Sequence, residues 1–130
     1  MSDFGLDKTY KLCSKVVIDD LFSSGKTIKV FPFIAIIKPQ QLSTKAPFQI
    51  VFSAPKRTFR KAHERNRIKR ICKEAVRLNK EPLELYLKES NQQLALFLVY
   101  SSAEELNHIQ LKKKITKLFN EIIKHLNENH

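Results

Sequence analysis

Seven consecutive apolar residues, Leu94 to Tyr100, constrain the fold of this chain more than any other segment. The run has the length of a strand, and it lacks the alternation of apolar and polar residues that a half-exposed strand shows. We therefore predict a central strand at residues 94–100 that is covered on both faces of its sheet.

Two further segments have strand composition. Residues 28–37 and 48–53 are rich in β-branched and aromatic side chains, and a polar loop separates them. Pro32 cannot donate a hydrogen bond to a sheet, so we expect an edge position, a bulge or a break there.

Helices are expected in three places. Ser14 and Gly25 bracket a short helix with an N-cap and a glycine end, and its buried stripe would hold Val17, Ile18, Leu21 and Phe22. Residues 59–80 have helical periodicity, and Pro82 marks a boundary after them. The segment Ser102 to Glu105 matches a capping box, which predicts a C-terminal helix over about 103–128.

The chain has 130 residues and 42% hydrophobic content, which suits one compact domain over residues 1–130. The order is helix, two or three strands, helix, strand, helix, so we predict a single α+β sandwich. No segment approaches a membrane span, and residues 1–12 contain no continuous apolar stretch of the kind a secretory signal needs. Cys13 and Cys72 have no paired spacing, so we expect a reducing, cytoplasmic location.

Positive charge is concentrated in residues 56–80. This segment holds eleven Lys and Arg residues against Glu64 and Glu74, which leaves +9 of the chain's net charge of +11. A polyanion can neutralise an excess of positive charge of this size, and its binding is favoured because the bound phosphates release their counterions. A surface that only confers solubility usually mixes both signs. The concentration therefore favours a nucleic-acid interface over a merely solvated helix face.

The predicted helix places its charges opposite its apolar side. Ile68, Cys72 and Ala75 fall on one arc at 100° per residue, and cationic residues fall on the other. The strongest candidates for phosphate contact are the arginines, since a guanidinium can bind phosphate in a bidentate manner. They are Arg65, Arg67, Arg70 and Arg77. The complete candidate set is Lys56, Arg57, Arg60, Lys61, Arg65, Asn66, Arg67, Lys69, Arg70, Lys73 and Arg77.

Groups that could support catalysis by the protein itself are not expected. The four histidines have no metal-site spacing, and two glycines cannot build a phosphate loop. The adjacent pairs Asp19-Asp20 and Glu104-Glu105 point in different directions on helices, so they form no convergent carboxylate pair. Cys72 lies on the apolar arc, which indicates a buried thiol. We expect no catalytic residue and no metal site.

The segment Arg65-Asn66-Arg67-Ile68-Lys69-Arg70, followed by Glu74 and Arg77, resembles the signature helix of the bacterial ribonuclease P protein subunit. The similarity extends to a short N-terminal helix with Phe22 and Gly25, to the strands, and to the approach at Lys56-Arg57. It implies an α-β-β-β-α-β-α sandwich shared with a ribosomal protein domain, including a left-handed crossover. The general handedness rule would not predict that crossover.

The resemblance also implies a function. In that family the RNA subunit is the catalyst and uses Mg²⁺, while the protein helps to bind precursor tRNA and its 5′ leader. The signature helix faces the catalytic RNA, and a cleft between the first helix and the sheet receives the leader. No cofactor of the protein and no obligate protein partner are implied. Stacking aromatics near the expected cleft are Phe22, Phe31, Phe33, Phe48 and Phe52.

Other classes of protein also fit the charge pattern. A ribosomal or general RNA-binding protein would show the same charge without stimulating precursor tRNA cleavage. A DNA-binding helix and a free-standing metal nuclease are less favoured, the latter because the carboxylate cluster is missing.

Overall fold

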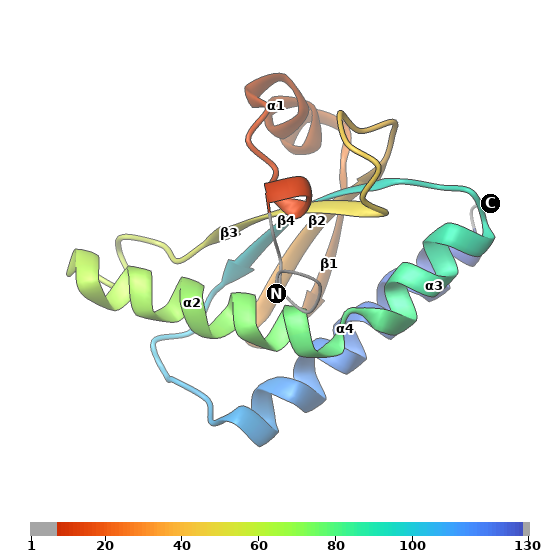
Figure 1. Ribbon diagram of the computed structural model, residues 1–130. Helices are drawn as coiled ribbons and strands as arrows, with labels where there is room; N and C mark the ends of the chain where they lie inside the picture. The colour runs from red at the N-terminus through yellow and green to blue at the C-terminus, as the bar shows by residue number, and fades with distance from the viewer. Residues whose placement is uncertain (1–7, 129–130) are drawn as a thin grey trace.

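The computed structural model describes residues 8–128, which form a four-stranded sheet between two layers of helices (Figure 1). The helices and strands, in order, are a 3-10 turn η2 (Lys8–Tyr10), α1 (Lys15–Ser24), β1 (Lys26–Val30), β2 (Phe33–Pro39), β3 (Phe48–Ser53), α2 (Ala62–Asn79), α3 (Glu81–Glu89), β4 (Leu94–Tyr100) and α4 (His108–Glu128). No helix in the described range is long and apolar enough to cross a membrane.

Strand β4 is the central strand that its sequence predicts. The order across the sheet is β1-β2-β4-β3, and β4 pairs antiparallel with β2 and parallel with β3. Leu94, Leu96 and Leu98 point into the main core, whereas Ala95 and Phe97 belong to a smaller cluster on the opposite face. The lack of alternation in this run therefore reflects burial on both faces.

The segment from residue 28 to 37 is a hairpin and not one strand. Val30 ends β1 and Phe33 begins β2, and the two strands pair antiparallel around a turn at Phe31 and Pro32. Of the three possibilities for Pro32, the structure has a break. The sheet gains its edge strand β1 from this turn.

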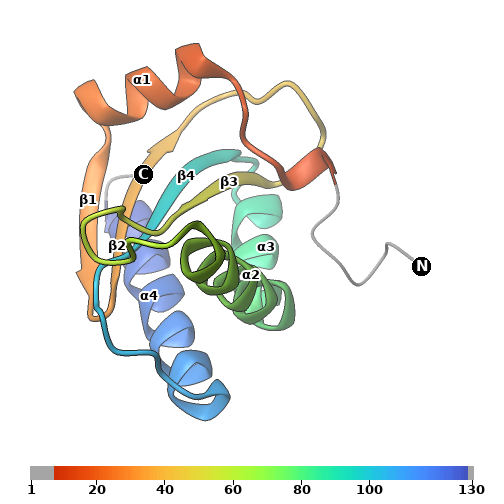
Figure 2. The ribbon, with the colours of Figure 1, turned by 90° about the vertical axis from the view of Figure 1, so that its left-hand side faces the viewer.

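The two faces of the sheet are covered unequally (Figure 2). Helices α2, α3 and α4 pack on one face, and α1 alone lies over the other. The predicted single-domain α+β sandwich is confirmed, with α3 as an additional helix. The hand of the connection from β3 through α2 and α3 to β4 stays a prediction.

The basic helix is shorter than predicted, and a second helix follows it. Helix α2 covers residues 62–79 instead of 59–80. The buried ring of Phe59 holds residues 59–61 in the loop that precedes the helix. Pro82 does mark a boundary, but it lies in the first turn of α3, where its missing N–H costs nothing. Leu83 and Leu87 of α3 are fully buried.

The C-terminal helix begins at His108, so the expected start near residue 103 is wrong. The Tyr100 hydroxyl donates to Glu104 O (2.5 Å) and accepts from Leu106 N (3.2 Å), which fixes residues 101–106 as a loop. The reciprocal cap lies further on, where Asn107 Oδ1 accepts from Gln110 N and Gln110 Oε1 accepts from Asn107 N. The Ser102 hydroxyl accepts only from Glu104 N.

Helix α1 has the predicted N-cap, since Ser14 Oγ accepts from Val17 N at 3.3 Å. Its buried stripe is narrower than expected. Leu21 is fully buried, Val17 and Ile18 are half-buried, and Phe22 is 59% exposed. Asp20 bonds to Lys38 of β2 at 2.5 Å, which fastens α1 to the sheet.

Candidate nucleic-acid interface

The loop before α2 is anchored in the core by Phe59. Its ring is 7% exposed and its centroid lies 6.1 Å from that of Tyr100. The N–H groups of Thr58 and Phe59 both donate to Pro55 O, which folds the loop back on itself. Lys56, Arg57 and Arg60 are left exposed on this loop beside the start of α2.

Arg65 holds the same loop from the helix side. Its Nη1 donates to Phe59 O (2.9 Å) and to Arg60 O (3.0 Å), and the residue is half-buried. The guanidinium therefore has a structural task as well as any contact with a ligand. Sequence periodicity alone places Arg65 on the helix without indicating these two bonds.

The outer side of α2 carries cations that no carboxylate of residues 8–128 neutralises. Lys69, Arg70 and Lys73 are exposed, with the uncharged Asn66 near them on the helix, and none of these three cations forms an ion pair within that range. Lys69 and Lys73 are four residues apart, so their charges repel each other. Lys56, Arg57, Arg60 and Lys61, on the loop that leads into the helix, are exposed as well, and we call these seven cations together the α2 face.

Two of the predicted arginines are in ion pairs. Arg67 Nη2 lies 2.9 Å from Glu105 Oε2, and Arg77 pairs with Glu74, its Nε 3.0 Å from Oε2. The Arg77 hydrogen bond holds the pKa of Glu74 below its ordinary value. Glu74 lies four residues after Arg70, a spacing that favours an ion pair between the two. In the structure Glu74 pairs with Arg77 instead. Of the four arginines singled out, Arg70 is both exposed and without an ion pair in the described chain.

A second surface is the face of the sheet beneath α1. Strand register aligns Ile34 with Val99, and Ile36 with Phe97, and all four side chains are half-buried. The Phe22 ring packs on Phe97 with centroids 4.8 Å apart at 64°. This face thus presents a partly exposed apolar platform with one accessible aromatic ring at its side.

The five aromatic candidates for the leader cleft differ in their exposure and in their position. Phe33 and Phe48 are fully buried in the main core under α2, α3 and α4, so neither is available for stacking on a base. Phe52 is half-buried and packs against that same core. Phe31 is 61% exposed but lies in the turn between β1 and β2. Phe22 is the candidate that borders the apolar platform.

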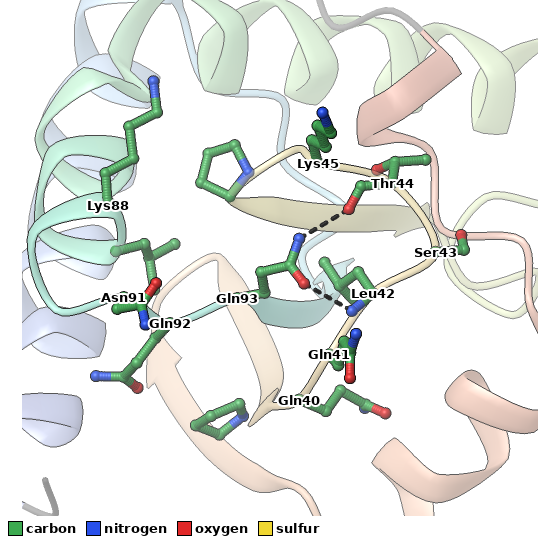
Figure 3. Close-up of a pocket in the computed structure, with 13 residues that line it drawn as sticks. Gln40, Gln41, Leu42, Ser43, Thr44, Lys45, Lys88, Asn91, Gln92 and Gln93 are labelled. Atoms are coloured by element: carbon green, nitrogen blue, oxygen red, sulfur yellow. Dashed lines mark hydrogen bonds between the residues drawn. The ribbon is translucent and has the colours of Figure 1, made fainter.

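A hollow of about 1010 Å³ lies at the end of the sheet where β2 ends and β3 begins (Figure 3). It is bounded by the loop of residues 40–47 and the end of α3. Gln93 bridges this loop, since its Oε1 accepts from Leu42 N and its Nε2 donates to Thr44 O and Ala46 O. The amide is thereby occupied in shaping the loop.

Reactive and metal-binding groups do not gather in the described structure. Residues 8–128 contain no group of three His, Cys, Asp or Glu side chains placed to hold a metal ion. Burial raises the pKa of the Cys72 thiol to about 12, so it stays protonated. Cys13 is exposed.

Comparisons with known proteins agree with this arrangement. A sequence model of the Ribonuclease P family matches residues 6–123. The ribonuclease P protein component of Porphyromonas gingivalis is 36% identical over 86 residues, which are 66% of this chain and 63% of that protein, just under two thirds of its length. That of Pseudoalteromonas translucida is 27% identical over 122 residues, 94% of this chain and 80% of that protein.

Solved structures show the same fold. The Staphylococcus aureus RNase P protein superposes with a TM-score of 0.67 over 87% of this chain and 94% of its own, at 14% identity. The Thermotoga maritima RNase P protein gives 0.67 over 85% and 96%, at 16% identity. The family match covers nearly the whole described chain, and we conclude that this chain belongs to the family of bacterial ribonuclease P protein components.

Proposed function

We propose that this chain is the protein subunit of a ribonuclease P ribonucleoprotein. In this role it binds the catalytic RNA and the 5′ leader of precursor tRNA, and so assists the endonucleolytic cut that produces the mature tRNA 5′ end. The RNA supplies the catalytic groups and the Mg²⁺ ions, and the protein works in the cytoplasm.

The observation that carries this proposal is the α2 face. Lys69, Arg70 and Lys73 are exposed and lack ion pairs among residues 8–128, and the loop cations Lys56 and Arg57 extend the same surface. Phosphates would neutralise this excess, and Arg70 offers a planar donor pair for one of them. Asn66 adds an uncharged donor and acceptor for a 2′-hydroxyl.

The platform beneath α1 supports leader binding. A single strand is held by rings on which bases stack and by cations along its backbone. Phe22 supplies an exposed ring supported by Phe97, and Lys29 lies opposite Ile34 in the strand register. The two surfaces lie on different sides of the molecule, since α2 covers one face of the sheet and α1 the other (Figure 2). Catalytic RNA and leader could then be bound together.

Binding of the whole chain to a labelled bacterial ribonuclease P RNA transcript tests the proposal. We expect steep salt dependence, with six to ten phosphate contacts costing roughly 10³ to 10⁵ in affinity between 50 and 200 mM salt. Duplex DNA at equal concentration should fail to displace the RNA. A flat salt response, or displacement by the DNA, would contradict the assignment.

A further inference from the structure

Helix α4 has a second cationic surface, separate from the α2 face. Its core side is buried through Leu111, Ile115 and Leu118, and at 100° per residue the opposite side points to solvent. The exposed residues on that side, which we call the α4 face, are Ile109, Lys113, Thr116, Lys117, Asn120 and Lys124.

The charges of the α4 face are not compensated within the described chain. Helix α4 contains five lysines against Glu121 and Glu128, a net of +3. No ion pair of residues 8–128 includes Lys113, Lys117 or Lys124, although Glu121 lies one turn away from the last two. Lys113 and Lys117 are four residues apart, so the isolated helix gains nothing from holding both. An anionic partner would remove this repulsion.

The α4 face also has a shallow depression along the helix axis. A shallow hollow of about 740 Å³ runs along this side of α4, and at 1.5 Å per residue it extends for about 18 Å from residue 109 to residue 121. It is lined by Ile109, Lys112, Lys113, Thr116, Lys117, Asn120 and Glu121, so cations outnumber the single carboxylate. Thr116 and Asn120 lie between the lysines and offer uncharged hydrogen-bonding groups, while Ile109 is 70% exposed at one end. Ammonium groups beside hydroxyl and amide groups suit phosphates and 2′-hydroxyls, and the exposed Ile109 suits a sugar face.

Acidic residues separate the α4 face from the α2 face. Glu105, just before α4, pairs with Arg67, and Glu74, which lies near His108 at the start of α4, pairs with Arg77. The strip between the two helices is therefore largely neutralised. One straight segment of RNA backbone on the α2 face would not continue along α4, so the α4 face would meet a different segment.

We propose that the α4 face binds a second segment of RNA backbone, through Lys113, Lys117 and Lys124. This inference rests on the proposed function, since it assumes that the chain binds a structured RNA. It adds a binding surface outside the signature helix and outside the platform beneath α1.

A triple substitution with a matched control tests the proposal. The variant Lys113→Gln, Lys117→Gln, Lys124→Gln removes three positive charges from the α4 face. The control Lys26→Gln, Lys45→Gln, Lys88→Gln removes three exposed charges from β1, the loop before β3 and α3. Binding of each full-length variant to a bacterial ribonuclease P RNA transcript and to vesicles of anionic lipid is measured across salt concentrations. Thermal unfolding is recorded for both variants.

We expect the α4 variant to reduce the slope of log affinity against log salt by about three, one for each phosphate that it no longer neutralises. Its affinity for the RNA at 150 mM salt should fall roughly tenfold to a hundredfold, while the control stays within about threefold of wild type. Equal behaviour of the two variants would overturn the proposal. So would weaker binding to the vesicles alone, because the surface would then face a membrane. If the wild-type chain itself fails to bind the RNA, it is the proposed function that fails.

Discussion

Arg65 Nη1 lies 2.9 Å from Phe59 O, so the first arginine of the signature segment is bonded to the loop that precedes its helix. We predict that Arg65→Ala lowers the free energy of unfolding by about 1 kcal/mol, because two carbonyls lose a donor. Arg70→Ala should leave the free energy of unfolding within about 0.5 kcal/mol of the wild-type value. The Arg70 side chain is exposed and forms no ion pair or side-chain hydrogen bond in the described chain.

Both variants should weaken RNA binding, Arg65→Ala by more because the loop carrying Arg57 and Arg60 loosens. Chemical denaturation and RNA titration of the two proteins check this. Arg65→Lys serves as a control that keeps the charge but replaces the planar guanidinium, whose Nη1 donates both bonds, by a shorter ammonium group. Equal stability of all three variants would show that the bonds of Arg65 do not hold the loop.

Phe22 and Phe31, which are about equally exposed, allow a test of whether the platform beneath α1 binds the leader. Phe22→Ala should weaken binding of a single-stranded leader by about 1–3 kcal/mol, the range for one stacked base. Phe31→Ala should leave leader affinity unchanged, because Phe31 lies in the β1–β2 turn, at the opposite end of β1 from α1. Fluorescence titration with a short RNA leader distinguishes the two. A matching decrease in both variants would place the leader elsewhere.

Phe33 tests the opposite case, because its ring is buried and we expect it to stabilise the core and not to contact the leader. Phe33→Ala should lower the free energy of unfolding by about 3–5 kcal/mol, because the ring is fully buried in the main core. Thermal unfolding measures the decrease, and a stable Phe33→Ala protein with impaired leader binding would return this residue to the leader site.

Gly25 is required by close packing. A Cβ there would lie 2.5 Å from Leu21 O and 2.7 Å from Ile36 Cγ2, although the residue has an ordinary negative φ of −76°. Gly25→Ala should therefore push α1 away from β2, lower the free energy of unfolding by about 1–3 kcal/mol, and weaken leader binding. Ser23→Ala, two residues earlier and exposed, should change neither. Unaltered unfolding of Gly25→Ala would show that α1 can move without cost.

Cys72 predicts a dependence of stability on alkaline pH. Its folded pKa of about 12 lies above the ordinary value of 9.0, so the neutral thiol contributes fully below pH 9. That contribution is lost as the pH rises from 9 toward 12, because the unfolded chain releases the proton first. Unfolding of wild type and Cys72→Ala across this range should show the steeper decline in wild type. Parallel curves would contradict the assignment of a buried neutral thiol.

The sequence predicts the layers of this fold well and the helix ends poorly. Leu94 to Tyr100 is a central strand because an uninterrupted apolar run needs cover on both faces, and the structure confirms it. The start of α4 could not be found from Ser102, because the hydroxyl of Tyr100 binds the backbone of residues 104 and 106 across the loop. These bonds span only four and six residues, but they join a side chain to the backbone of a loop and therefore follow neither helical nor strand periodicity.

The same limit applies to the interface. Charge density identifies α2 as the basic helix, but pairing decides which arginines are free, and Glu105 reaches Arg67 from 38 residues away. The aromatic candidates could not be sorted from sequence, because alternation along a strand gives two faces without showing which one α1 leaves open. Phe33 and Phe22 are told apart only by the packing of the helices.

Cleavage of precursor tRNA at low Mg²⁺ tests the central claim most directly. The assay compares the protein alone, a bacterial ribonuclease P RNA alone, and the two together. Our account predicts stimulation in the mixture only, with a product that carries the mature tRNA 5′ end. A correctly folded protein that binds the RNA without stimulating it would be a general RNA-binding protein, and cleavage by the protein alone would contradict the assignment of catalysis to the RNA.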